Sequence, residues 1–311
     1  DPTTAALALT RRDAGAHVAV HAPPEETDDA VAVALADAGV AVFARSDGDR
    51  TALGDALLDT RPQLLLDDGA HLIRRAHRER RDALATLVGA AEETTSGVRA
   101  LRAMADAGAL AIPCLAVDDA RTKRIVDNGH ATGQSCVLAV LDATGVLLAG
   151  RAVAVAGYGP VGRSVAAHAA ALGARVTVSE IAPHRALEAL HDGHAVAPLQ
   201  EACATAELLF SATGVRGTIP LEALRALPDG AIVAVAGGVE EEVAVRALRA
   251  EATRIERVGP DVEAFTLGDG TRRVLLVAGG GCVNVTAAEG NPIEAMDCSL
   301  ALQALAADEL A

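Results

Sequence analysis

The sequence predicts an α/β protein with two domains, each a doubly wound parallel sheet covered by helices. Three observations predict this fold class. Short apolar runs suited to buried strands alternate with helical patterns along the whole chain. A glycine-rich turn joins one apolar run to a helical pattern near the middle of the sequence. The length of 311 residues is typical of two domains.

The expected elements follow in chain order. Strands are expected at residues 17–21, 40–44, 63–66, 85–88, 111–116, 152–156, 175–178, 208–211, 231–236 and 274–277. Helices are expected at residues 28–38, 51–58, 134–141, 162–172, 221–226 and 292–307. We therefore expect a substrate-binding domain of residues 1–128 together with 292–311, and a cofactor-binding domain of residues 129–291.

A glycine fingerprint, Gly157-x-Gly159-x-x-Gly162, lies between an apolar run and a helical pattern. In this setting the first glycine permits a tight turn, the second lets the backbone approach a pyrophosphate, and the third allows close helix–strand packing. Free N–H groups at the start of the helix favour an anion. Glu180 ends the next apolar run, where a carboxylate binds an adenosine ribose and repels a 2′-phosphate. The segment predicts a Rossmann-like domain that binds NAD; the alternative is a tight turn that binds nothing.

Composition excludes several classes of partner. The net charge of −15 argues against nucleic acid, and aromatic residues at 1% leave little for base stacking. No apolar run reaches about 18 residues, so no membrane partner is expected. The five cysteines form no C-x-x-C pair, which predicts no metal site and no disulfide framework, and favours a reducing cytoplasmic location.

Four polar segments follow predicted strands, at the sheet edge where α/β proteins bind ligands. They read Leu66-Asp67-Asp68-Gly69, Glu92-Glu93-Thr94-Thr95-Ser96-Gly97, Asp119-x-x-x-Lys123-x-x-x-Asp127-Asn128, and Gly281-x-x-Asn284 followed by Gly290-Asn291-Pro292. Each has a plainer alternative. For the first segment the alternative is a turn, and for the second it is the start of a helix. For the third it is a surface ion pair between Lys123 and Asp127.

Together with the fingerprint, these segments resemble the S-adenosylhomocysteine hydrolase family in order along nearly the whole chain. That family has LDDG, EETTTG, TKxxxDN, AGYGxVGKG, and VN followed by GHP. The counterparts here include Thr122-Lys123-x-x-x-Asp127-Asn128, Ala156-Gly157-Tyr158-Gly159-Pro160-Val161-Gly162-Arg163-Ser164 and Val283-Asn284.

The resemblance implies an enzyme that uses bound NAD to oxidise the 3′-hydroxyl of an adenine nucleoside, eliminate the 5′ substituent and reduce the ketone again. It implies that Glu93 and Asp127 hold the sugar hydroxyls, that Lys123 assists hydroxyl deprotonation, and that Asp68 is the acid–base near the leaving group. The NAD contacts that it implies are Thr94, Thr95, Asn128, Gly157, Gly159, Val161, Gly162, Glu180, Thr213 and Asn284. The substrate contacts are Thr4, Asp68, Glu93, Lys123, Asp127 and Asn291. A homo-oligomer, a dimer or a tetramer, is also expected.

Several positions depart from the family pattern. The histidine after a strand-end glycine is Gly238 here, the histidine of GHP is Asn291, and another family histidine aligns with Ala30. The cysteine after the DN segment is replaced by Thr132. His130 is a candidate substitute proton carrier, and a solvated loop histidine is the alternative. The groups for oxidation are thus kept, while those that handle homocysteine, the adenine edge and water are changed.

Three functions stay open. The first is a nucleoside dehydratase that oxidises, eliminates water and reduces again, as in the biosynthesis of an angustmycin-type antibiotic. The second is a divergent S-adenosylhomocysteine hydrolase that releases homocysteine and adenosine. The third is an NAD-binding regulator without activity. Intact Lys123 and Asp127 weigh against the third, and the lost histidines against the second, so we expect dehydration.

Overall fold

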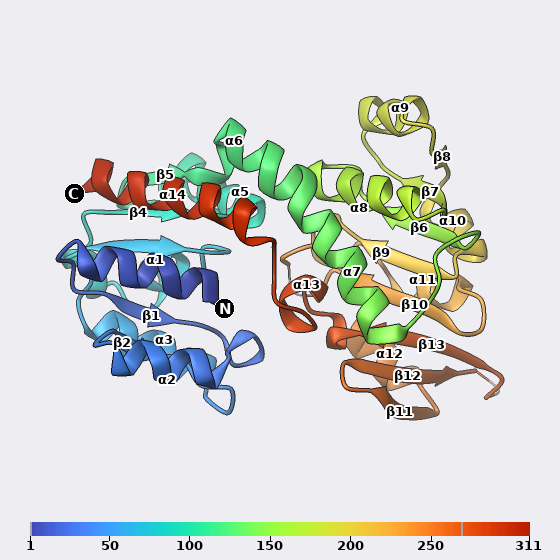
Figure 1. Cartoon of the computed structure of the whole chain (residues 1–311), viewed down its shortest axis with the longest axis horizontal. Coiled ribbons are helices and arrows are strands. Elements are labelled where there is room, and N and C mark those ends of the chain that lie inside the picture. Colours follow the sequence, from blue (N-terminus) through green and yellow to red (C-terminus); the bar gives the residue numbers. More distant parts are fainter. Residues whose placement is uncertain (1, 240, 269) are drawn as a thin grey trace. The chain divides into compact units, whose positions relative to one another are not determined.

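The computed structural model describes residues 2–239, 241–268 and 270–311, and its helices and strands are labelled in Figure 1. The chain divides into two compact units. Unit 1 comprises Asp1–Arg124 and Ile293–Ala311, and unit 2 comprises Ile125–Pro292. Which of them binds substrate and which binds cofactor stays a prediction at this point. No helix in the described part of the chain is long and apolar enough to cross a membrane.

Unit 1 is built on two small parallel sheets. One pairs β1 (Ala19–His21) with β2 (Ala41–Phe43), and in the other β4 (Gly89–Glu92) lies between β3 (Leu64–Asp67) and β5 (Cys114–Ala116). The helices of this unit are α1 (Pro2–Asp13), α2 (Asp29–Asp37), α3 (Arg50–Asp59), α4 (His71–Arg78), α5 (Thr95–Asp106), α6 (Arg121–Lys123) and α14 (Ile293–Leu310). α14 packs on α1 and β4.

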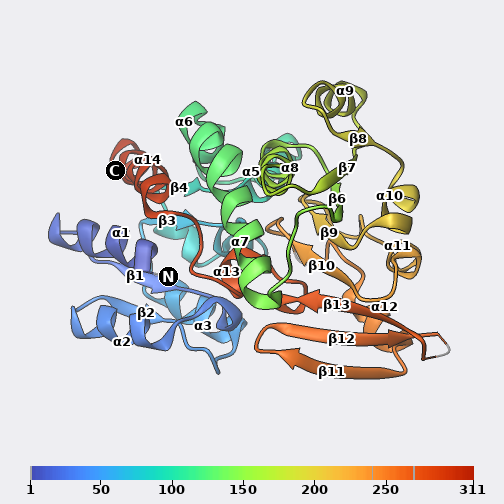
Figure 2. The same cartoon turned by 45° about the vertical axis from the view of Figure 1, so that its right-hand side comes forward.

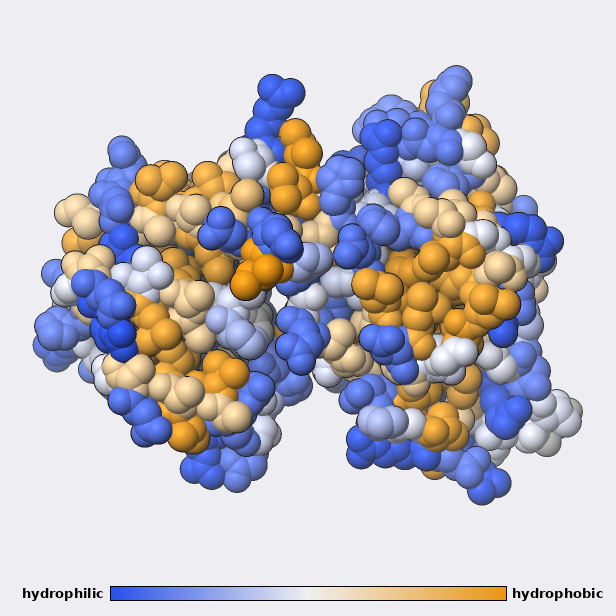
Figure 3. All heavy atoms as spheres, in the orientation of Figure 1, coloured by the Kyte–Doolittle hydropathy of each residue, from blue (hydrophilic) through white to orange (hydrophobic). Residues whose placement is uncertain are grey.

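The strand expected at residues 85–88 is wrong. Residues Ala83–Ala85 form a short 3-10 helix, and the strand begins at Gly89. β4 pairs with β3 on one side and with β5 on the other, and its residues Ala90 and Ala91 are fully buried. Small side chains at these positions allow close packing in the interior. The strand therefore lies directly after the segment 85–88 that the sequence predicted, and not within it. Figure 3 shows apolar side chains among hydrophilic ones along α14 of this unit.

Unit 2 contains one eight-stranded sheet of order β11-β12-β13-β10-β9-β6-β7-β8. Its strands are β6 (Ala152–Ala156), β7 (Arg175–Ser179), β8 (Ala195–Val196), β9 (Leu208–Ser211), β10 (Ala231–Val235), β11 (Arg254–Gly259), β12 (Val262–Leu267) and β13 (Arg272–Val277). Neighbours in the run β13-β10-β9-β6-β7-β8 all pair in parallel, which confirms the predicted fold class. The antiparallel pairing of β12 with β11 and β13 was not expected. β11 is a polar, largely exposed edge strand, so it lacks the apolar run that marks a buried strand.

Helices cover both faces of this sheet, as Figure 2 shows. They are α7 (Thr132–Thr144), α8 (Pro160–Ala171), α9 (Pro183–His191), α10 (Leu199–Thr205), α11 (Leu221–Ala226), α12 (Val245–Glu251) and α13 (Val283–Thr286). Alternate residues of β6 face opposite layers: Val153 and Val155 pack with α7 and α8, whereas Ala154 and Ala156 pack with α10 and α11. Because β6 and its neighbours run in parallel, their carboxyl ends meet at one edge of the sheet, where the glycine fingerprint lies.

Candidate active site and cofactor site

The glycine fingerprint forms the turn between β6 and α8 of unit 2. Gly157 has a φ of 92°, and a Cβ there would lie 2.7 Å from the carbonyl oxygen of Ala212. A Cβ at Gly162 would lie 2.0 Å from the carbonyl oxygen of Gly157. A Cβ at Gly159 would have only the guanidinium of Arg185 nearby, at 3.8 Å. The first and third glycines thus allow close backbone packing, and the second borders open space.

The groups around this turn fit a dinucleotide. α8 begins at Pro160 with Val161 in its first turn, and no side chain caps its N–H groups, which attract anions. Glu180 follows β7, and its two oxygens accept from the N–H groups of Tyr158 at 2.7 Å and Ala182 at 2.8 Å. Each carboxylate oxygen can accept a second bond. An adenosine ribose can therefore bind Glu180 without displacing these contacts.

Thr213 follows β9 and is held by a fully buried carboxylate that sequence analysis did not single out. Glu242 Oε2 accepts from the hydroxyls of Ser211 at 2.6 Å and Thr213 at 2.8 Å, and Oε1 accepts from the N–H of Gly214 at 3.0 Å. Glu242 therefore fixes the loop after β9. The NAD contact of Thr213 stays a prediction.

Asp127 and Asn284 are joined through Asn291 within unit 2. The Nδ2 of Asn291 donates to Asp127 Oδ1 at 2.6 Å, and its Oδ1 accepts from Asn284 Nδ2 at 2.9 Å. Asp127 lies in the π-helical segment Arg124–Ala131, a form that often occurs at functional sites. Asp127 is 4% exposed and Lys123 is 3% exposed, so the alternative of a surface ion pair is wrong.

Lys123 is enclosed by two carboxylates of unit 1. Its Nζ lies 3.4 Å from Asp118 Oδ1 and 3.6 Å from Glu93 Oε1. Asp118 is fully buried and also accepts from the hydroxyl of Thr95 at 2.8 Å. Glu93 Oε2 accepts from Nε2 of Gln303, on α14, at 2.7 Å. Segments far apart in the chain therefore hold one amine and its two acids in place.

The loop between β3 and α4 carries Asp68, which is itself exposed. A buried neighbour fixes this loop: the two oxygens of Glu92 accept from the N–H groups of Gly69 and Ala70, both at 2.8 Å. Glu92 Oε1 also accepts from the hydroxyl of Thr94 at 2.7 Å. Thr94 caps α5, so the plainer alternative of a helix start at this segment is confirmed, and the NAD contact of Thr94 stays a prediction. Glu92 thus connects two of the predicted motifs.

A second buried acid supports the same loop. Asp67 Oδ2 accepts from the N–H of Ile73 at 2.9 Å, and its Oδ1 accepts from the N–H of Asp68 at 3.0 Å. Burial raises the pKa of Asp67 to about 7, and burial followed by the charge of Asp67 raises the pKa of Glu92 to about 8. The hydrogen bonds that both acids accept oppose these shifts. Protonation of Asp67 or Glu92 would therefore change the hydrogen bonds that hold the loop carrying Asp68.

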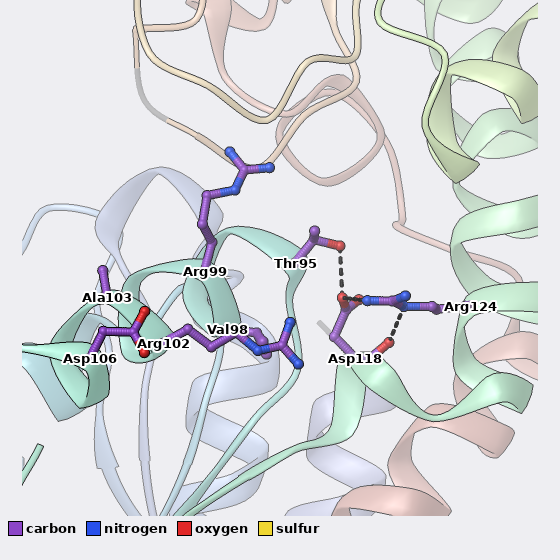
Figure 4. Close-up of a pocket in the computed structure, with 8 residues that line it drawn as sticks. All are labelled: Thr95, Val98, Arg99, Arg102, Ala103, Asp106, Asp118 and Arg124. Carbon is purple, nitrogen blue, oxygen red and sulfur yellow. Dashed lines mark hydrogen bonds and ion pairs between the residues drawn. The ribbon is translucent and has the colours of Figure 1, made fainter. Parts of the chain in front are cut away.

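A cavity of about 330 Å³ opens beside Asp118 in unit 1 (Figure 4). It is lined by Thr95, Val98, Arg99, Arg102, Ala103, Asp106, Asp118 and Arg124. In Figure 4 the hydroxyl of Thr95 points to Asp118, and Arg124 lies against the same carboxylate. Two of the guanidinium groups pair with acids: Arg102 pairs with Asp119, and Arg124 pairs with Asp118 and Asp119. The NAD contact of Thr95 stays a prediction.

The remaining predicted residues lie as follows. Thr4 is exposed on α1, and Asn128 is half-buried beside Asp127. His130 is exposed, as the alternative of a solvated histidine expects, and Gly238 is exposed after β10. In residues 2–239, 241–268 and 270–311, no group of three or more His, Cys, Asp or Glu side chains could hold a metal ion.

Composition held a signal that motif analysis did not use. Lys123 is the only lysine among 27 lysine and arginine residues. Arginine serves every other such position, and a guanidinium does not give up its proton at neutral pH, whereas an amine can. Asp118 offered no comparable signal, because only burial distinguishes it from the half-exposed Asp119 next to it.

Comparison with known proteins identifies the family. Residues 128–290 match the model of the S-adenosyl-L-homocysteine hydrolase NAD binding domain. Adenosylhomocysteinase of Thermotoga maritima is 42% identical over 307 residues, which cover 97% of this chain and 76% of that protein. Adenosylhomocysteinase of Archaeoglobus fulgidus is 43% identical over 312 residues, covering 99% and 76%. S-inosyl-L-homocysteine hydrolase of Methanopyrus kandleri is 42% identical over 313 residues, covering 99% and 74%.

These matches agree with the geometry of unit 2. The matched region contains the fingerprint turn, the uncapped start of α8 and Glu180, all of which fit a dinucleotide. NAD is therefore the cofactor of this protein. By identity over nearly its whole length, the chain belongs to the S-adenosyl-L-homocysteine hydrolase family.

Proposed function

We propose that this protein acts on a purine nucleoside by oxidising the 3′-hydroxyl of its sugar, removing the proton on the neighbouring carbon and eliminating the 5′ substituent. The burial of one amine, Lys123, between Glu93 and Asp118 carries the proposal. An amine that is desolvated and flanked by acids is suited to proton transfer and has no evident use in a regulator that only binds NAD.

The residues of the chain supply proton transfer and position. When bound, NAD+ accepts a hydride from the hydroxyl-bearing carbon and later returns it. Lys123 can pass a proton to Asp118 or Glu93 and then accept the proton of a sugar hydroxyl. Glu93 and Asp127 accept hydrogen bonds from sugar hydroxyls. Asp68, on its fixed and exposed loop, exchanges a proton with the 5′ leaving group.

Cleavage of a thioether is the first candidate outcome. The relatives that share 42–43% of their residues with this chain are named adenosylhomocysteinase and S-inosyl-L-homocysteine hydrolase. Their names support S-adenosylhomocysteine, or its inosine counterpart, as the substrate. Adenine and hypoxanthine present different hydrogen-bonding edges. The test below therefore compares substrates that carry either nucleobase.

Loss of water from a hydroxymethyl nucleoside is the second candidate. Asn291 stands where the family pattern has a histidine, and its amide is engaged with Asp127. An amide cannot deliver a proton at neutral pH, whereas hydrolysis must return water to an unsaturated ketone. Reduction of that ketone without addition of water would leave an alkene. This reading connects the protein with antibiotic biosynthesis of the angustmycin type.

Product analysis separates the two candidates. The NAD-loaded protein is incubated with S-adenosylhomocysteine, S-inosylhomocysteine and an adenine nucleoside that carries a free hydroxymethyl group. Release of free thiol together with nucleoside supports thioether cleavage. A product lighter by one water supports dehydration.

Lys123→Arg is the matched control for this test, since it keeps the charge beside Glu93 and Asp118 but does not give up a proton at neutral pH. It should bind NAD and form no product. If the unchanged protein binds NAD but none of the three compounds produces the near-ultraviolet band of NADH, the proposal is wrong and the regulator alternative is favoured.

A further inference from the structure

Asn291 lies at the centre of a hydrogen-bond network in unit 2, and all of its polar capacity is used there. Its Nδ2 donates to Asp127 Oδ1 at 2.6 Å and to Thr132 Oγ1 at 3.0 Å. Its Oδ1 accepts from Ser135 Oγ at 2.8 Å and from Asn284 Nδ2 at 2.9 Å. A side-chain amide has two donors and two acceptor lone pairs. These four bonds fill the amide and leave none of its atoms for a substrate.

The orientation of this amide follows from its partners. A carboxylate oxygen can only accept, so the NH2 group of Asn291 must face Asp127. Thr132 Oγ1 accepts from the same NH2 group and donates its own hydrogen to Asp127 Oδ1 at 3.1 Å. Asp127 Oδ1 thus receives two hydrogen bonds, which fix the rotation of the carboxylate.

The network closes a loop onto the segment that carries Asp127. The N–H of Gly290 donates to the carbonyl of Asn284 at 2.7 Å, and Pro292 restricts the backbone of Asn291 from the other side. The side-chain oxygen of Asn284 accepts from the thiol of Cys282 at 3.0 Å. Asn291 is therefore presented to Asp127 by a loop with little freedom.

We propose that Asn291 is a positioning residue: its amide holds the carboxylate of Asp127 in the orientation that receives a sugar hydroxyl, and ties it to Asn284. This role rests on the proposed function and replaces the direct substrate contact that sequence analysis expected of Asn291. A neutral histidine ring could make at most two of these contacts, one as donor and one as acceptor. It has two hydrogen-bonding nitrogens, whereas the amide makes four bonds.

Asn291→Ala tests this role, with Ser135→Ala as the matched control. Ser135 contacts the same amide on the side away from Asp127. The NAD-loaded protein is mixed with nucleoside, and formation of NADH is followed in a single turnover. Asn291→Ala should slow this step by about 100-fold, as expected when a positioned donor is lost, and should change kcat more than KM. Ser135→Ala should slow it by roughly fivefold or less.

An Asp127→Asn background shows whether Asn291 acts through Asp127. There, Asn291→Ala should add no more than about threefold, because residues that act as a unit are not additive. An unchanged rate in Asn291→Ala, or full additivity in the Asp127→Asn background, would overturn the positioning role.

The isosteric Asn291→Asp gives a second readout that a merely structural role would not move. It sets two acids together, and one shared proton restores the contact. Its rate should therefore rise toward that of the unchanged protein as the pH falls. The titratable groups around the network are Asp127, Cys282, and Cys136 of α7, whose thiol pKa burial raises to about 12. A rate ratio that does not change with pH would contradict the proposal.

Failure of the proposed function gives a different result. In that case the unchanged protein binds NAD, and no nucleoside forms NADH. Urea unfolding still measures the contact between Asn291 and Asp127. It compares the unchanged protein, Asn291→Ala, Asp127→Asn and the double variant. Coupling between the two substitutions supports it, and strict additivity overturns it.

Discussion

Units 1 and 2 both hold polar groups at strand ends, but they do so with different chemistry. In unit 1 each buried acid has a second acid nearby: Asp67 lies near the buried Glu92, and the buried Asp118 shares Lys123 with the half-buried Glu93. In unit 2 the buried carboxylate of Asp127 is held by neutral amide and hydroxyl groups. Paired acids depend on a shared cation or proton. Unit 1 should therefore respond more strongly than unit 2 to pH and to the loss of a single partner.

The largest effect is expected at Lys123. Lys123→Met should reduce turnover by roughly 10³-fold, as for loss of a proton carrier. It should also lower the free energy of unfolding by about 3–5 kcal/mol, because Asp118 and Glu93 lose the charge between them. Steady-state kinetics and urea unfolding measure the two effects. Lys123→Arg should restore most of the stability and none of the turnover, and retention of activity in either variant would remove Lys123 from the mechanism.

Glu180 tests the cofactor site of unit 2. Glu180→Ala should weaken NAD binding by about 10–100-fold, the range for loss of a hydrogen bond to a charged group. Calorimetric titration with NAD measures the change. The matched control is Glu188→Ala, an exposed acid of α9 that pairs with Arg163 and should leave NAD affinity unchanged. Equal affinity in both variants would show that Glu180 does not contact the ribose.

The paired acids of unit 1 predict a dependence of stability on pH. Both pKa values are raised in the folded state, to about 7 for Asp67 and about 8 for Glu92, so the folded protein binds protons that the unfolded chain releases. The resulting stability is present below about pH 4 and is lost as the pH rises through 7 and 8. Urea unfolding across this window should show a loss of up to about 1.4 kcal/mol per pH unit for each acid. Asp67→Asn should flatten the slope, and an unchanged slope would refute the raised pKa of Asp67.

Gly159 should show the smallest change in stability. Its φ of −72° is open to any residue, and a Cβ would have only Arg185 nearby. Gly159→Ala should therefore raise the free energy of unfolding by about 0.4–1 kcal/mol through the unfolded state. It should nevertheless weaken NAD, because the methyl group occupies the approach of the pyrophosphate. Gly157→Ala is the contrasting variant and should destabilise the fold, since its Cβ would meet the carbonyl of Ala212. Unimpaired NAD binding by Gly159→Ala would place the pyrophosphate elsewhere.

Local pattern was sufficient for much of unit 2. The predicted strands 152–156 and 208–211 and the helix 221–226 have the same bounds in the structure, because each is an apolar run or a helical pattern ended by residues of a different kind. The fingerprint was likewise readable, since Gly157 and Gly162 answer local steric demands and Gly159 leaves open the space that a pyrophosphate would need. The shift of β4 to Gly89 and the polar edge strand β11 were missed, because strand pairing rather than composition sets them.

By itself, the sequence determined the fold class, the family resemblance and the cofactor, because these depend on residue types at short, fixed spacings. The catalytic and substrate-binding residues that it points to stay predictions. Only the tertiary structure decided which partners those residues have. It placed Asp118, rather than its neighbour Asp119, against Lys123, and it engaged the amide of Asn291 with Asp127. The physical reason is that hydrogen bonds and burial join side chains across 164 positions of the chain, and no local pattern encodes such a pairing.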